Sequence, residues 1–180
     1  VWYIGWNGNK SKLWNRANVL FARINEETLK VEDKFFPQIP GRNSWEKNHA
    51  YFDHEGELYT VYSTSPTHKV FRVECNKVLA TYETPTQVNW RYGYIRGGAS
   101  PVLHNGEYYH FFHGMIERGN EKRRLYTIGV ACFEAKPPFK ITRITHEPLQ
   151  IAEDNPGGDI EVIFPGGAHF VDGRWGIMCG

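Results

Sequence analysis

The chain has 180 residues, of which 15% are aromatic, and 21 basic against 20 acidic side chains give a formal net charge of +1. This length and apolar content suffice for one domain with a hydrophobic core and exclude a disordered tail. The balanced charge argues against nucleic acid or a membrane surface as a partner, and no apolar run approaches the roughly 20 residues of a membrane span.

Short apolar segments with strand-like alternation follow one another along the whole chain, and turn residues separate them. The first half predicts strands at residues 1–6, 18–24, 29–36, 50–53, 58–63, 69–74 and 78–83. The second half predicts strands at 101–104, 107–113, 125–134, 139–145, 162–171 and 175–179, with a charged loop over 116–124. No stretch has sustained helical periodicity, so we predict an all-β fold.

The clearest unit of the pattern is Tyr92–Gly114. It predicts a tight glycine turn at 96–98 that carries Arg96, a strand, a two-residue hairpin turn at Asn105-Gly106, and a second strand that ends at His113. Related hairpins occur at 50–62 and 168–178, and their turn glycines, Gly56, Gly106 and Gly173, lie 50 and 67 residues apart.

This repeat predicts a β-propeller. Each hairpin is followed by one or two further strands, and propeller blades have about four strands and repeat roughly every 40 to 50 residues. We expect a β-propeller fragment with blade remnants at about 1–44, 45–92, 93–160 and 161–180. The chain begins and ends inside predicted strands, so we expect it to be truncated at both ends, as part of a longer protein. The competing fold is a β-sandwich.

Polar residues precede the first strand of two of these units. Lys47 and Asn48 precede the hairpin at 50–62, and Arg96 precedes the next hairpin. Because the inner strands of a propeller converge on a central channel, we expect these side chains to meet at one mouth of it. His113 and Tyr126, at the ends of neighbouring strands, are expected beside them. A cationic set of Lys47, Arg96 and His113 suits phosphate or a carboxylate.

Structural roles compete with these assignments. His113 alone could be a strand-end histidine whose hydrogen bonds are satisfied, and Arg96 could pair with Glu46 and tie two units together. Aromatic residues near the expected mouth could either stack on sugar rings or fill the core; they are Trp45, Trp90, Tyr92 and Tyr94.

Metal and disulfide chemistry are not indicated. The histidines have no metal-ligand spacing, so we expect no metal site and no cofactor. Cys75, Cys132 and Cys179 are widely spaced, so we expect buried thiols in a reducing, cytoplasmic compartment.

Five segments, in this order along the chain, resemble the β-mannoside phosphorylase family, glycoside hydrolase family 130. They are Arg96–Leu103, Tyr109–Gly114, Tyr126–Ala131, His146–Leu149 and Val162–Ala168. Glu46-Lys47-Asn48 followed by a hairpin resembles variants of that family found as domains in larger carbohydrate-related proteins.

The resemblance implies a five-bladed propeller, of which this chain would hold about three blades, that acts on β-mannosides by phosphorolysis or hydrolysis. In the phosphorylases of this family a single aspartate is the general acid and inorganic phosphate is the nucleophile, hence a co-substrate. By motif, His113 would be a phosphate ligand and Tyr126 would line the site, with Lys47, Asn48 and Arg96 as further phosphate- or sugar-binding residues. The family's acidic motif precedes the strand that matches Trp2–Trp6, so we expect the proton donor to be absent from this chain.

Two other functions stay open from the sequence. The first is a carbohydrate-binding or scaffolding propeller without catalysis. The second is another five-bladed glycosidase clan, with three carboxylates around the axis; Asn48, Gly98 and Gly166 at the corresponding positions argue against it.

Overall fold

The computed structural model describes residues 2–8, 18–41, 47–86, 88, 90–118, 123–152 and 162–180, with the backbone alone at 2–8, 18, 118 and 123. Within these residues it contains β-strands and no helix, which confirms the all-β prediction. No helix in this part of the chain is therefore long and apolar enough to cross a membrane. The strands are β1 Trp2–Gly8, β2 Asn18–Ile24, β3 Val31–Phe35, β4 Ala50–His54, β5 Glu57–Ser63, β6 Thr67–Glu74, β7 Lys77–Pro85, β8 Tyr94–Gly98, β9 Val102–His104, β10 Glu107–Arg118, β11 Arg123–Glu134, β12 Ile141–Ile144, β13 Gln150–Ile151, β14 Pro165–Val171 and β15 Arg174–Cys179.

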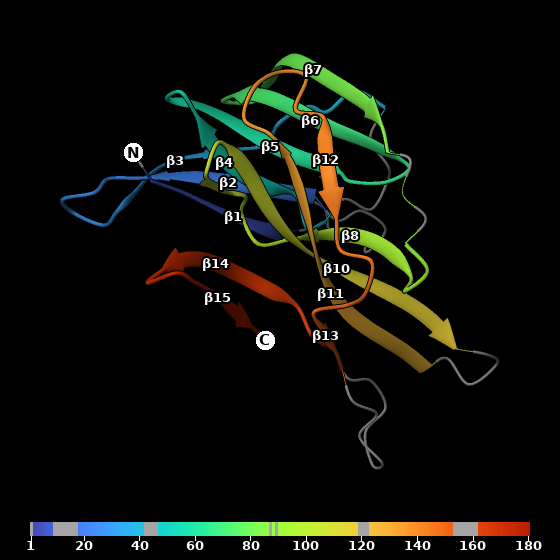
Figure 1. Cartoon of the computed structure of the whole chain (residues 1–180). Coiled ribbons are helices and arrows are strands. Elements are labelled where there is room, and N and C mark those ends of the chain that lie inside the picture. Colours follow the sequence, from blue (N-terminus) through green and yellow to red (C-terminus); the bar gives the residue numbers. More distant parts are fainter. Residues whose placement is uncertain are drawn as a thin grey trace.

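The described strands form antiparallel sheets that follow the order of the chain (Figure 1). The first sheet has the order β1-β2-β3 and the second the order β4-β5-β6-β7. The third has the order β12-β11-β10-β8, with β9 continuing the β8 edge and β13 pairing with β11. The fourth is the hairpin β14-β15. Each sheet is thus built from consecutive strands.

The three predicted hairpin turns adopt the backbone conformation that matches the twist of the strands they connect. Both central residues have positive φ in each turn: 54° and 81° at Glu55-Gly56, 49° and 80° at Asn105-Gly106, and 49° and 75° at Asp172-Gly173. Type I′ turns need this geometry, which glycine, asparagine and aspartate adopt at low cost. The turns therefore fix the registers of β4-β5, β9-β10 and β14-β15.

Apolar side chains pack each sheet against the next one in the chain. The second and third sheets share the largest buried cluster, centred on Phe52, which makes edge-on ring contacts with Tyr108, Phe133 and Phe139. Removing a buried ring of this kind costs about 3–5 kcal/mol of stability. A second cluster, including Phe21 of β2 and Phe71 of β6, joins the first two sheets. Trp175 joins the fourth sheet to the third through Tyr109 and Phe111, with ring centroids 4.7 and 5.2 Å away.

The structure corrects the predicted glycine turn at 96–98. These residues belong to strand β8, which pairs with β10, and neither Gly97 nor Gly98 has positive φ. The glycines instead permit close packing of backbones. A Cβ on Gly97 would lie 1.6 Å from the carbonyl oxygen of Asn48, and one on Gly98 would lie 2.2 Å from that of Phe111.

Strand β10 also differs from the prediction, because it runs on through His113 to Arg118. His113 and Tyr126 therefore lie within long paired strands and not at strand ends. Of the cysteines only Cys132 is buried. Cys75 lies in the turn after β6 and Cys179 at the end of β15, and both are exposed, so the expectation of buried thiols was wrong for these two.

Candidate functional site

Three segments at or next to the edge strands β4, β8 and β14 of successive sheets meet in space. Lys47 and Asn48 come before β4, and Gly97 of β8 packs directly on the Asn48 carbonyl. Gly98 packs on Pro165, the first residue of β14, whose ring a Cβ at Gly98 would meet at 2.8 Å. The sheet order therefore brings together residues that are more than a hundred positions apart in the sequence.

A cavity of about 340 Å³ opens between the second and third sheets at this meeting point. Lys47, Asn48, Arg96 and Gly97 line it on one side. The rest of the lining consists of His49, Ile95 and the segment 61–64, which is the end of β5 and the residue after it. Three of the predicted site residues, Lys47, Asn48 and Arg96, are thus placed around one hollow.

Neither Lys47 nor Arg96 forms an ion pair with a carboxylate of the described residues. Glu46, the alternative partner for Arg96, lies outside the described residues, as does Trp45. Two cations that are close in space repel each other, and an anion between them would relieve that repulsion. Lys47 and Arg96 therefore make the lining of this cavity positively charged.

His113 lies beside the cavity and is held in one tautomer. Its Nδ1 is 2.6 Å from the carbonyl oxygen of Gly97, which can only accept a hydrogen bond. Nδ1 therefore carries the proton, and Nε2 is left with a lone pair when the ring is neutral. The ring stacks on Tyr126, with centroids 5.9 Å apart and planes at 22°, and contacts Phe164 at 5.1 Å.

Burial lowers the pKa of His113 to about 4. The hydrogen bond to Gly97 opposes this shift in part, whereas the charges of Arg96 and Lys47 lower the pKa further. The imidazole is thus neutral at pH 7, which corrects the expectation of a cationic His113. The positive charge of the site comes from Lys47 and Arg96, and His113 contributes a hydrogen-bond acceptor.

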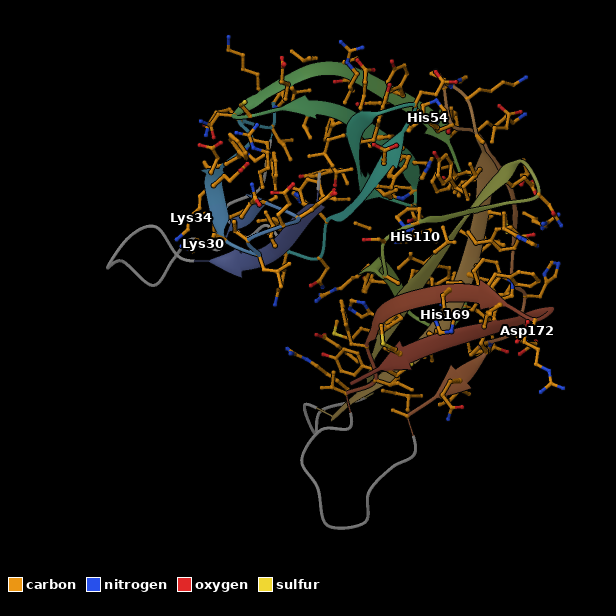
Figure 2. All side chains as sticks on the ribbon, turned by 90° about the vertical axis from the view of Figure 1, so that its left-hand side faces the viewer. Lys30, Lys34, His54, His110, His169 and Asp172 are labelled. Atoms are coloured by element: carbon orange, nitrogen blue, oxygen red, sulfur yellow. The ribbon has the colours of Figure 1, made fainter. Side chains whose placement is uncertain are left out.

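A second pair of buried histidines lies behind the cavity. Nδ1 of His110 is 3.5 Å from Oγ1 of Thr64, a residue of the cavity wall. His110 is fully buried, and Figure 2 places it between the sheets. Burial, with smaller contributions from His68 and His113, lowers its pKa to about 3, and burial lowers that of His68 to about 4. These rings are neutral polar groups in the core.

The sequence pointed to Tyr126 by resemblance, and the structure places it against His113. Two neighbours of the site were not predicted. Phe164 was passed over because it reads as an ordinary strand residue, although it lies in the Val162–Ala168 motif. His68 was passed over because its isolated position in β6 carries no spacing signal.

Metal ligation has no support in the described part of the chain. No group of three or more histidine, cysteine, aspartate or glutamate side chains there is arranged to hold a metal ion.

No model of a known protein family and no curated protein matches this chain. Among solved structures, the chain is similar to the β-1,2-mannobiose phosphorylase from Listeria innocua in its complex with β-1,2-mannobiose. The TM-score is 0.58 and the sequence identity 16%, and the match covers 94% of this chain and 53% of that one. The chain therefore spans about half the length of that enzyme, and at this identity the similarity establishes the fold alone.

Proposed function

We propose that this chain is part of a five-bladed β-propeller that acts on β-mannosides at the propeller axis, by phosphorolysis or hydrolysis. Sheets in chain order, each packed on the next, support blades, since radial repetition of this kind builds a propeller. In this reading residues 45–92 and 93–160 form whole blades and residues 1–44 and 161–180 form partial ones. The solved structure with the similar fold is named as a mannobiose phosphorylase, which favours this substrate class.

The observation that carries the proposal is the pair of cations Lys47 and Arg96, which line one cavity beside His113 and have no carboxylate partner among the described residues. A phosphate group needs such neutralisation before it can attack a sugar. Arg96 supplies fixed, forked donors, and Lys47 supplies a mobile point charge.

The tautomer of His113 gives the site a preference among anions. Hydrogen phosphate carries an O–H group, which can donate a hydrogen bond to Nε2 of the neutral ring. Sulfate has no proton to donate at neutral pH. We therefore assign His113 as the acceptor for the protonated oxygen of the phosphate.

Cleavage of a glycosidic bond also needs a proton for the leaving oxygen, from a carboxylic acid on the face opposite the nucleophile. No carboxylate lines the described cavity. In this proposal the acid comes from residues other than those that line it, and Lys47, Arg96 and His113 orient the phosphate.

The test is an assay of the protein in its natural length on β-1,2- and β-1,4-mannobiose, with and without inorganic phosphate. Phosphorolysis predicts mannose 1-phosphate that forms only with phosphate, and hydrolysis predicts mannose in both conditions. No turnover in either condition would reject the enzymatic proposal.

The lack of a carboxylate in the described lining of the cavity favours a second candidate, a propeller that binds carbohydrate without cleaving it. This candidate predicts saturable binding of mannobiose and no turnover. An aspartate elsewhere in the protein whose substitution by asparagine abolishes turnover would decide for the enzyme.

A further inference from the structure

Strand β8 contains an extra residue next to His113. Gly98 lies opposite Phe112 of the neighbouring strand β10. Arg96 lies opposite His113, the next residue of β10, so Gly97 is an extra residue in β8. This arrangement is a β-bulge, in which the extra residue is left out of the regular pairing of the two strands. The carbonyl oxygen of Gly97 lies 2.6 Å from Nδ1 of His113, so a side chain takes up its hydrogen bond.

The same glycine contacts the segment that precedes β4. A Cβ on Gly97 would lie 1.6 Å from the carbonyl oxygen of Asn48 and 2.8 Å from its carbonyl carbon, so the two backbones touch directly. Asn48 has a φ of 63°, in the left-handed region that few residues other than glycine, asparagine and aspartate adopt. This angle sets the direction of the preceding peptide, which joins Asn48 to Lys47, relative to the carbonyl that touches Gly97. A change of φ at Asn48 would therefore turn Lys47 away from its present direction.

The side chains of the candidate site are all attached to this backbone contact. Lys47 directly precedes Asn48, and Arg96 directly precedes Gly97. His113 is joined to Gly97 by the hydrogen bond from Nδ1. The charges of Lys47 and Arg96 reach His113, since both lower its pKa. The contact between Asn48 and Gly97 therefore helps to fix how the two cations and the imidazole lie relative to one another.

We propose that Asn48 is a positioning residue, which directs Lys47 toward Arg96 and His113 through its left-handed backbone and does not bind the phosphate with its side chain. This inference rests on the proposed function, since it takes phosphate as the ligand of the site. Asparagine suits the position because its short polar side chain tolerates a positive φ, whereas a β-branched side chain does not. The sequence suggested Asn48 as a phosphate- or sugar-binding residue, and the inference replaces that role with a backbone role.

The test compares Asn48→Gly and Asn48→Thr with the unchanged chain by calorimetric titration with inorganic phosphate. Glycine adopts a positive φ readily and has no side chain. Threonine keeps a side chain of similar size that can form hydrogen bonds, but it avoids a positive φ. The two variants therefore separate a backbone role from a side-chain role.

Asn105→Thr is the matched control. Asn105 also has a positive φ, of 49°, but it lies in the hairpin turn before β10 and does not line the cavity. Circular dichroism and thermal melting verify that each variant folds. The control thus reports what the same substitution at a similar φ does to stability alone.

We expect Asn48→Gly to bind phosphate within about twofold of the unchanged chain, and Asn48→Thr to bind it about tenfold more weakly, as a misplaced cation implies. Asn105→Thr should lower the melting temperature and leave the phosphate affinity unchanged. If Asn48→Thr fails to fold, Asn48→Gly decides alone, since an unchanged affinity supports the inference and a loss of affinity overturns it.

Three other results would overturn the inference and leave the proposed function intact. They are weaker binding in Asn48→Gly than in Asn48→Thr, equal affinities in these two variants, and a loss of affinity in Asn105→Thr as large as that in Asn48→Thr. If the unchanged chain binds no phosphate, the proposed anion site itself fails, and the inference fails with it.

Discussion

Two arginines, on strands β6 and β12, differ in their ion pairs from the two cations of the inner edge, by which we mean the segments Lys47–Asn48 and Arg96–Gly98 at the cavity of about 340 Å³. Arg72 of β6 pairs with Glu57 at 3.0 Å, and Arg143 of β12 pairs with Glu107 at 2.6 Å. Lys47 and Arg96 have no such partner among the described residues, although they lie close enough to His113 to lower its pKa.

Under the proposed function, the difference separates structural charges from charges that bind a ligand. A surface arginine with a carboxylate partner is satisfied and adds little to stability. Cations that line one cavity repel each other, and an anion between them would reduce that repulsion. The inner edge also has the tightest backbone contacts, since Gly97 and Gly98 leave no room for a side chain. Four predictions test this contrast, from the largest effect to the smallest.

Gly97→Ala should be the most damaging substitution at the inner edge. Its Cβ would overlap the Asn48 carbonyl, which is backbone and cannot rotate away. We expect a loss of stability of about 3 kcal/mol or more, or failure to fold. Gly166→Ala is the control, because the nearest atom to its Cβ would be 3.9 Å away. Urea denaturation measures both, and equal stability of the two variants would contradict the packing described here.

The buried histidines should make stability fall in acid. The unfolded chain protonates each histidine near pH 6.5, whereas the folded pKa values of His68, His110 and His113 are about 4, 3 and 4. Below pH 6.5 the unfolded state therefore binds more protons, and each ring destabilises the fold by about 1.4 kcal/mol per pH unit until its folded pKa is reached.

The variant His110→Gln isolates one of these contributions. We compare the free energies of unfolding of the variant and of the unchanged protein. Their difference should become smaller by about 1.4 kcal/mol per pH unit as the pH falls from 6.5 to 4.5, because only the unchanged protein carries the destabilising His110. Urea denaturation at several pH values measures this difference. A difference independent of pH would show that His110 titrates normally.

Arg96→Ala should separate binding from stability. We expect phosphate affinity to fall about tenfold to a hundredfold, the value of one or two charged hydrogen bonds, with little change in melting temperature. Arg72→Ala should leave phosphate affinity unchanged and cost about 0–1 kcal/mol of stability. Calorimetric titration and thermal melting provide both quantities. A large melting decrease with unchanged affinity would make Arg96 a structural residue like Arg72.

The smallest expected effect is discrimination between anions. At pH 8 phosphate should bind about threefold to tenfold more tightly than sulfate, the value of one net hydrogen bond to Nε2 of His113. His113→Phe keeps an aromatic ring in the stack and removes the acceptor. Competition titration should therefore show equal affinities for phosphate and sulfate in this variant. An unchanged preference for phosphate would mean that another group accepts the hydrogen bond from the phosphate O–H.

Much of this arrangement is predictable from local sequence. Two of the hairpin turns were predicted correctly from the pairs Asn105-Gly106 and Asp172-Gly173, which lie between segments of alternating apolar and polar residues. Such turns depend on only a few adjacent residues. The repeat of these hairpins also predicted that Lys47, Asn48 and Arg96 would meet, and the structure places them around one cavity.

The remainder depends on contacts between distant segments. Gly97 and Gly98 resemble a turn in sequence, yet they are strand residues whose neighbours are Asn48 and Phe111. The charge of His113 could not be predicted, because it is set by burial, by Gly97 and by two cations from separate segments of the chain. None of these three influences can be inferred from the position of His113 in the sequence.

The most direct test follows the imidazole of His113 by 15N NMR during titration with inorganic phosphate. We predict a saturable shift of its Nε2 resonance at pH 8, with a phosphate affinity that falls about tenfold or more in Arg96→Ala. A resonance that does not respond to phosphate, or one that responds equally in Arg96→Ala, would contradict an anion site formed by these residues.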